Sequence, residues 1–229
     1  MHFFGPLDLA SFAFFLAAWI FYAVLLEWTR FGADGLNGRI DRYREAWFRR
    51  TLAREMRIVD TQIMMALQSG AAFFASTSLI AIGGALGLLR TTEQIIELVS
   101  GLPFGVPSTR EQWEAKTVGL AVILVYAFFK FSWSYRLFNY VAILLGAMPP
   151  VAEKDTPEAE AHVIRTTRVF QSAARHFNRG QRAFFFALGY LGWFIHPWVF
   201  IAATAAVLVV MLLRQFASAP LAALVDEVK

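Results

Sequence analysis

Long apolar segments alternate with polar ones along the chain, and four of the apolar segments have the length of a membrane span. A helix needs about 20 predominantly apolar residues to cross the hydrocarbon layer of a bilayer. The apolar runs cover residues 9–26, 63–89, 118–145 and 183–213. They predict an all-α polytopic membrane protein, a four-transmembrane-helix bundle with spans at about 9–28, 63–89, 117–140 and 184–213.

Composition supports the same class. With 58% hydrophobic residues and a mean hydropathy of +0.51, the chain has too little polar sequence to coat a soluble globule. The segment before Leu9 has no Lys or Arg, so it lacks the cationic region of a secretory signal, and the first run is interpreted as a retained span. We therefore treat residues 1–229 as a single membrane domain.

The distribution of cations predicts the orientation, because Lys and Arg in short connections are retained on the cytoplasmic side. Arginines crowd the connections 29–60 and 149–182, which are expected to be cytoplasmic, whereas 90–116 holds few cations and is expected to be external. Four spans then place both termini outside a bacterial-type cytoplasmic (inner) membrane. This bias also accounts for the net charge of +4, so nucleic acid is not expected as a partner.

The second cytoplasmic connection predicts an amphipathic helix that runs into the fourth span. Its arginines fall within an arc of roughly 100°, opposite an apolar face. This face is compatible with three interpretations: binding of anionic membrane lipids, binding of an acidic partner, and plain solvation. If it binds lipids, the stripe would lie along the headgroup layer. The first connection repeats the pattern less regularly, around Arg50, Arg54 and Arg57. The stripe consists of Arg165, Arg168, Arg175, Arg179 and Arg182.

Ionisable residues within or beside the spans are the candidate functional cluster, since a charge in a membrane normally faces the bundle interior. The polar cluster consists of Lys130, Arg136 and Asn139 in the third span, His196 in the fourth, and Asp60 and Glu27, which border the second and first spans. We expect Asp60 to pair with a cation of the third span, preferably Arg136, whose guanidinium can hold both carboxylate oxygens. A structural ion pair and an ion pathway are the two interpretations.

Small residues in the second span predict a helix-packing face. Ser76 lies on the same helix as Gly83 and Gly87, which form a G-x-x-x-G spacing that lets helix backbones approach closely. The contact could join helices of one chain or two protomers, and the same residues could line a narrow polar passage. A homo-oligomer or membrane complex is therefore expected.

His196 precedes Pro197 inside the fourth apolar run, where proline is expected to kink the helix. A haem ligand is the sharper alternative, but no second histidine lies within a span, so no cofactor is predicted. The chain has no cysteine, no G-x-S-x-G and no phosphate-binding glycine loop. Enzymatic activity is not expected.

Several strings are similar to domain of unknown function 599, a family of uncharacterised multi-spanning membrane proteins. The resemblance covers all four spans and implies a fold class but no mechanism. Phe185 and Phe186 stand where the family often has tyrosine. The matching strings are RIVD (57–60), FFASTS (73–78), FSWSYRLFNY (131–140), GAMP (146–149), RAFFFAL (182–188) and WFIHPW (193–198).

Two functions remain open from the sequence. The first is a non-enzymatic assembly or accessory protein whose arginine faces meet lipid or a partner. The second is a small oligomeric ion channel or transporter that uses the intramembrane charges, since four helices alone enclose little lumen. Ion flux through liposomes separates them, and closed ion pairs would favour the first.

Overall fold

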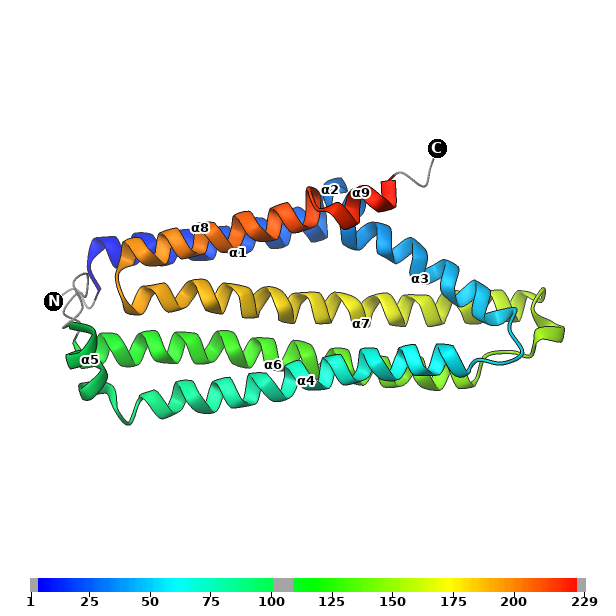
Figure 1. Cartoon of the computed structure of the whole chain (residues 1–229), viewed down its shortest axis with the longest axis horizontal. Coiled ribbons are helices and arrows are strands. Elements are labelled where there is room, and N and C mark those ends of the chain that lie inside the picture. The colour runs from blue at the N-terminus through cyan, green and yellow to red at the C-terminus, as the bar shows by residue number, and fades with distance from the viewer. Residues whose placement is uncertain (1–3, 101–108, 226–229) are drawn as a thin grey trace. The chain divides into compact units, whose positions relative to one another are not determined.

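The computed structural model describes residues 4–100 and 109–225, and within these ranges every regular element is a helix. Long helices joined by short turns make up the fold (Figure 1). In chain order they are α1 (Pro6–Trp28), α2 (Arg30–Asp34), α3 (Leu36–Leu52), α4 (Ile58–Leu88), α5 (Thr92–Ser100), α6 (Arg110–Gly146), α7 (Pro157–Tyr190), α8 (Pro197–Phe216) and α9 (Ala219–Val225), with 3-10 turns at Val151–Glu153 and Leu191–Phe194.

Four segments are long and apolar enough to cross a membrane. They are Pro6–Trp28, Ile58–Leu88, Arg110–Gly146 and Pro197–Leu224. The first three correspond to the predicted spans at 9–28, 63–89 and 117–140, and α4 and α6 continue beyond the apolar residues into polar ones. The predicted all-α class with four membrane-length apolar helices is confirmed.

The fourth predicted span, 184–213, is not one kinked helix. Helix α7 ends at Tyr190, and α8 begins only at Pro197. His196 has an extended backbone, and its Nδ1 accepts a hydrogen bond of 3.1 Å from the backbone N–H of Trp198, which makes it the N-cap of α8. The kink prediction was wrong because a residue before proline avoids helical geometry, and proline itself suits the first position of a helix.

The chain reverses direction between α7 and α8 (Figure 1). A Cβ placed on Gly189 would lie 3.4 Å from Cα of Thr204, although a straight helix would separate these residues by about 22 Å. At Gly192 a Cβ would lie 2.9 Å from the carbonyl oxygen of Val199, so only glycine fits this turn. The apolar run 183–213 is therefore a helical hairpin.

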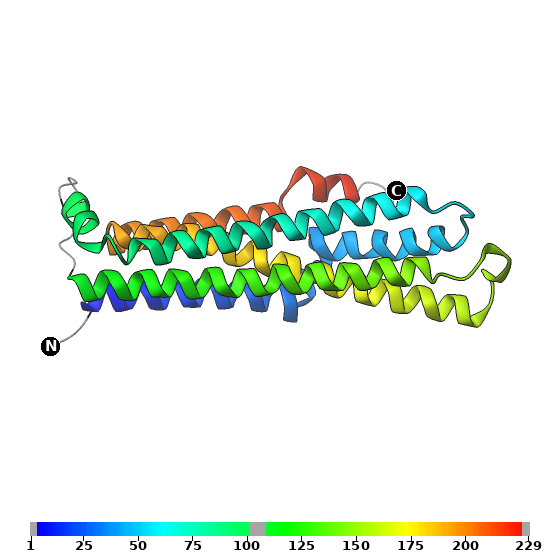
Figure 2. The ribbon, with the colours of Figure 1, turned by 90° about the horizontal axis from the view of Figure 1, so that it is seen from below.

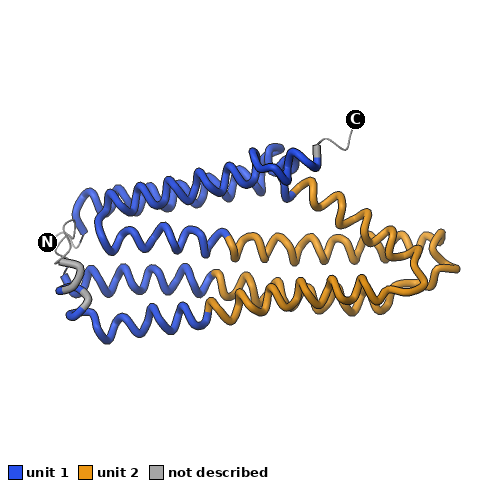
Figure 3. The backbone as a smooth tube through the Cα atoms, viewed as in Figure 1, with its two compact units in different colours: residues 1–37, 79–126, 182–229 blue, residues 38–78, 127–181 orange. Residues whose placement is uncertain are grey.

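The described chain forms two compact units, and α4, α6 and α7 each contribute to both (Figure 3). Unit 1 contains residues 1–37, 79–126 and 182–229, and unit 2 contains 38–78 and 127–181. The prediction of a single membrane domain stays a prediction.

In unit 1, α1 and α8 run parallel. Asp8 at the start of α1 contacts Trp193 just before α8, and further along Tyr22 donates from its hydroxyl to the carbonyl of Met211. Residue numbers thus rise together along both helices. Phe15 on α1 contacts the rings of Phe186 and Tyr190 on α7 and of Phe200 on α8, which makes it the centre of an aromatic core shared by the three helices.

The parallel pair bears on the predicted placement of the termini. Two helices that cross a membrane side by side in the same direction have their starts on one side and their ends on the other. If α1 and α8 both cross the membrane, the two termini of the chain cannot both lie outside. The placement of both termini outside stays a prediction; it counted 184–213 as one crossing.

Unit 2 is a bundle of α3 with parts of α4, α6 and α7. Helix α3 lies beside the first part of α4, to which residues 53–57 connect it (Figure 2). At the start of α7, the hydroxyl of Thr156 caps the helix by accepting from the N–H of Ala159. All four helices contribute to one core, which includes Phe48 and Leu52, Met64 and Ala71, Phe138, Val141, Leu145 and Met148, and Ala159, Val163, Phe170 and Ala173.

Candidate functional site

Asp60 is the centre of a closed polar network in unit 2. Its side chain is fully buried, and Oδ1 accepts hydrogen bonds from Trp47 Nε1 at 2.6 Å, Thr51 Oγ1 at 3.0 Å and Arg54 Nη1 at 2.7 Å. Oδ2 is buried without a hydrogen-bond partner among the described residues. The carboxylate is thus shielded from solvent, and the charge that balances it belongs to Arg54, whose side chain is 43% exposed.

Local sequence explains this network. Trp47 and Thr51 are four residues apart and share one face at the end of α3. Asp60 lies in the first turn of α4, where the helix dipole favours a negative charge. Arg57 fastens the connection to the end of α6 by donating from Nη1 to the carbonyl of Met148 at 3.0 Å and from Nη2 to that of Pro149 at 2.7 Å. The network therefore joins three helices.

The predicted pair between Asp60 and Arg136 was wrong. Arg136 instead donates from Nε to the hydroxyl of Tyr140 at 2.7 Å. Helices α4 and α6 are antiparallel, and Gln68 on α4 is hydrogen-bonded to Asn139 on α6. In that register Arg136 lies about 16 Å along the helices from the level of Asp60. The register of two antiparallel helices depends on their packing, so the sequence alone does not show which residue of α6 lies at the level of Asp60.

A buried lysine in unit 1 was missed as a site residue. Lys116 is 5% exposed, and its Nζ donates to the carbonyl of Trp193 at 3.0 Å and lies 3.7 Å from Oδ1 of Asp8. The same Oδ1 accepts from Trp193 Nε1 at 2.7 Å. The lysine was counted only as a cation of the external connection. One signal was present: Asp8 and Lys116 directly precede apolar runs that start on the same predicted side.

Glu27 and Arg182 form another ion pair with a buried cation inside unit 1. Arg182 Nη2 lies 2.8 Å from Glu27 Oε1, and the arginine side chain is 7% exposed against 25% for the glutamate. The prediction that Arg182 continues the exposed stripe was wrong, because at this level α7 is packed against α1. Glu27 is likewise not part of a cluster with Asp60. Glu27 pairs with Arg182, whereas Asp60 pairs with Arg54.

The rest of the stripe on α7 is largely exposed. Arg165, Arg168 and Arg175 face away from the core, whereas Arg179 is half-buried and interacts with a neighbour. Lys130 on α6 is also half-buried and has an interaction partner. Neither of the last two cations is free.

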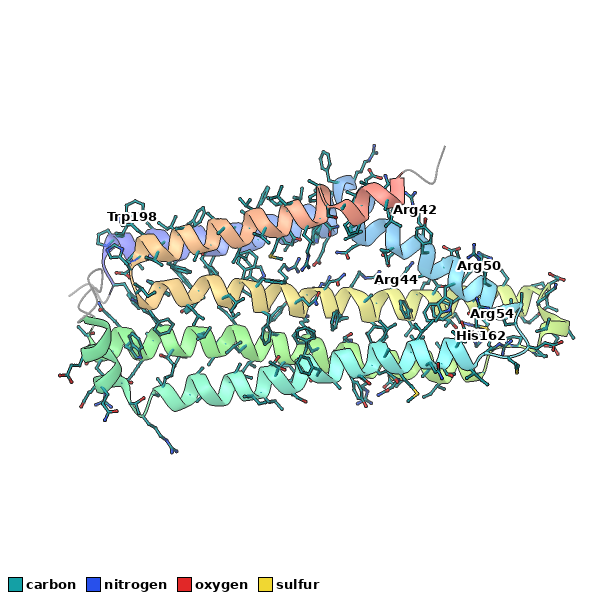
Figure 4. The ribbon with its side chains drawn as sticks, in the orientation of Figure 1. Arg42, Arg44, Arg50, Arg54, His162 and Trp198 are labelled. Atoms are coloured by element: carbon teal, nitrogen blue, oxygen red, sulfur yellow. The ribbon has the colours of Figure 1, made fainter. Side chains whose placement is uncertain are left out.

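Further exposed arginines lie on α3. Arg42 and Arg50 project from this helix, whereas Arg44 reaches toward α7 and lies over the ring of Phe170, 5.5 Å from its centroid (Figure 4). We call the exposed set in unit 2 the arginine face. It consists of Arg42 and Arg50 on α3 and Arg165, Arg168 and Arg175 on α7.

An ion-pair bridge joins α3 to α7 beside the arginine face. Arg49 Nη1 lies 2.6 Å from Glu160 Oε2, and Arg49 Nη2 lies 3.0 Å from Glu45 Oε1. The hydrogen bond from Arg49 lowers the pKa of Glu160, and the bonds to Glu160 and Glu45 raise the pKa of Arg49. Both side chains of the bridge are 46% exposed, so screening by solvent keeps its contribution to stability small.

The predicted packing face on α4 has no partner within the described chain at its glycines. A Cβ on Gly83 or Gly87 would meet no atom within 4 Å, and Ser76 is exposed. The contact within one chain is therefore not formed at these residues. Packing between protomers stays a prediction.

An open groove of about 610 Å³ runs along α6 in unit 2. It combines one cation with aromatic and apolar side chains. Its lining residues are Phe129, Ser132, Trp133, Tyr135, Arg136, Asn139, Tyr140 and Ile143.

Comparison with known proteins gives a family and no activity. The sequence pattern of one family, described as protein of unknown function DUF599, matches residues 10–220. No curated protein and no solved structure matches the chain. The match covers the candidate spans almost completely and includes every buried ion pair described above except Asp8 of the pair with Lys116.

Proposed function

The chain belongs to the DUF599 family of proteins of unknown function, and its four membrane-length apolar helices characterise an integral membrane protein; from this premise we propose that it is a non-enzymatic accessory protein. In this proposal unit 1 lies in a bacterial-type cytoplasmic membrane. Unit 2 presents the arginine face to an acidic partner protein in the cytoplasm.

The exposure of Arg165, Arg168 and Arg175 carries this proposal. The opposite face of α7 supplies Val163 and Phe170 to the core of unit 2, so the helix is already anchored and its arginines are not needed for packing. Side chains that stay exposed and cationic over several helical turns suit recognition of carboxylates.

The length of α7 favours a protein partner over the membrane surface. The helix is uninterrupted from Pro157 to Tyr190, so it does not bend at Arg182 to lie in the headgroup layer. Arg165 lies about 12 Å further along the helix than Ala173, whose carbonyl accepts from Ser134 on α6 at 2.8 Å and so marks the level of Arg136. Attraction to anionic headgroups fades over a Debye length of about 8 Å at physiological salt.

The hairpin supports a revised topology with the N-terminal end external and the end of α8 cytoplasmic. The arginine-rich connections remain cytoplasmic under the positive-inside rule. Helix α7 then returns across the membrane before α8, although its composition is less apolar. Neighbours in unit 1 shelter it there, since Ala183, Phe186 and Tyr190 are almost fully buried.

Closed ion pairs favour the accessory role over the ion channel. The charges that a pore would need to converge are separated: Asp60 is enclosed by its own donors, and Arg136 lies in a groove open to the outside of α6. Buried groups satisfied in pairs stabilise a fold and offer no continuous polar path.

The test uses the full chain in native membranes. On a native gel, wild type should migrate in a complex larger than the isolated protein. The variant Arg165→Gln/Arg168→Gln/Arg175→Gln should reach the membrane at wild-type levels and keep its melting temperature, but should no longer migrate in that complex. A matched control neutralises external cations, in Arg90→Gln/Arg110→Gln.

Two results would contradict the proposal. If the wild-type protein from native membranes migrated as an isolated protein on the gel, the proposed partner would be contradicted. Ion flux through liposomes containing purified wild type, blocked by Asp60→Asn, would support the channel instead.

A further inference from the structure

Arg136 is an exposed cation on an apolar helix surface. Its Nε donates to Tyr140 at 2.7 Å, and its Cζ lies 5.7 Å from the centroid of the tyrosine ring. Among the described residues no carboxylate pairs with it, and Nη1 and Nη2 donate to none of them. Tyr140 therefore orients the guanidinium while leaving its two terminal amino groups available.

Other donors lie on the same face. Ser132, Arg136 and Asn139 are spaced four and three residues apart, which aligns them along one side of α6. Asn139 accepts from Gln68 Nε2 through Oδ1 at 2.7 Å, so its amide nitrogen is left as a donor in the groove. A hydroxyl, a guanidinium and an amide nitrogen are suited to the oxygens of a phosphate group.

The position of Arg136 along α6 indicates the source of a phosphate that these donors could bind. Lys116, in the polar contact with Asp8, marks the external end of the apolar part of the helix. Arg136 follows 20 residues later, which corresponds to about 30 Å, the thickness of the hydrocarbon layer. The exposed rings of Trp133, Tyr135 and Tyr140 surround this position, as expected for an aromatic belt at the headgroup level.

We propose that the groove binds an anionic phospholipid of the cytoplasmic leaflet. Its phosphate contacts Arg136, Asn139 and Ser132, and an acyl chain lies against Phe129, which is 64% exposed on the side toward the membrane centre. A second copy of this chain is a poorer occupant, because a symmetric contact would bring two Arg136 side chains together. The site is independent of the partner proposed for the arginine face.

The experiment measures lipid binding to the full chain in a neutral detergent. Dioleoyl phosphatidylglycerol is titrated against dioleoyl phosphatidylcholine, with bound lipid counted by native mass spectrometry and the melting temperature followed in parallel. Wild type should bind the anionic lipid preferentially. Arg136→Gln should weaken that binding about fivefold. Arg175→Gln, which removes an exposed arginine outside the groove, should leave it unchanged.

Two further measurements distinguish binding of a lipid headgroup from binding of a free anion, and a loss of binding from a loss of folding. Inorganic phosphate at the same concentration should not raise the melting temperature, because it uses no apolar contact. Tyr140→Phe keeps the charge but releases the guanidinium, so it should weaken binding by a smaller factor and gives a readout if Arg136→Gln does not fold.

Several results would overturn the proposal. If Arg136→Gln and Tyr140→Phe each bound the anionic lipid as well as wild type does, the groove would be excluded as the binding site. Equal losses of binding in Arg136→Gln and Arg175→Gln would indicate general charge attraction. Stabilisation by phosphate alone would indicate a small-anion site. A dimer that Arg136→Gln dissociates without lipid would identify a second copy as the occupant.

Discussion

The two units hold their buried charges in opposite ways. Inside unit 1 the cations are the buried partners: the Arg182 side chain is 7% exposed and that of Lys116 6%, whereas Glu27 and Asp8 are 25% and 20% exposed. In unit 2 the carboxylate of Asp60 is the buried partner, and its arginine is 43% exposed.

The difference matches two kinds of surroundings. A cation on a helix surrounded by acyl chains must turn inward to a carboxylate, because exposure to hydrocarbon is costly. Arginines of a unit that reaches water can remain outside, and a carboxylate can be buried where helix ends supply N–H and O–H donors. The charges therefore support placing unit 1 in lipid and the arginine face in water.

The largest expected effect is the labelling of single cysteines, for which the cysteine-free chain is a clean background. In spheroplasts, an impermeant maleimide should label Thr91→Cys at once. Arg168→Cys and Ala217→Cys should react only after permeabilisation, and Ala202→Cys, on the exposed face of α8, should remain unlabelled.

Each outcome tests one side of the comparison. Labelling of Ala217→Cys from outside would support the prediction of two external termini and contradict a parallel crossing of α1 and α8. Rapid labelling of Ala202→Cys would place the surface of unit 1 in water.

Breaking the ion pair of unit 1 should have the next largest effect. Arg182→Met leaves Glu27 without its cation, and loss of one partner of a buried pair costs about 3 kcal/mol at the lower end of the usual range. The free energy of unfolding in detergent should fall by this amount, while Glu27→Gln/Arg182→Met should recover most of it. Arg175→Met, on the exposed part of the same helix, is the control.

A smaller loss is expected in unit 2, where Asn can still accept some of the hydrogen bonds of Asp60. Asp60→Asn should lower the free energy of unfolding by about 2 kcal/mol, and Thr51→Val by about 1 kcal/mol. Because both residues share one hydrogen bond, the double variant should lose less than the sum. Strict additivity would contradict the closed network.

The smallest effect concerns the exposed bridge between Arg49 and Glu160. The folded protein lowers the pKa of Glu160, so the bridge stabilises the fold above the ordinary pKa of 4.5 and this contribution disappears as the pH falls through the lowered value. Glu160→Gln should therefore melt slightly below wild type at pH 7, and the difference should vanish as the pH falls through the lowered pKa of Glu160. Glu158→Gln serves as the control, and a difference that grows in acid would contradict the bridge.

Part of the candidate site could be predicted from single residue types. Asp60, Glu27 and Arg136 stand out because charges beside or inside long apolar runs are uncommon. Their partners could not be predicted, since pairing depends on the register of antiparallel helices. Lys116 was missed for the same reason: a lysine at the end of a span looks solvated until the start of α1 is packed against it.

The sequence by itself determined the helical class, the membrane-length apolar helices and the amphipathic character of α7, because these depend on composition and on a period of 3.6 residues along one segment. Only the tertiary structure decided that 183–213 folds back at His196, that α1 and α8 run parallel, and that Arg182 is buried while Arg168 is exposed. These features depend on contacts between residues far apart in the chain, which local periodicity does not encode.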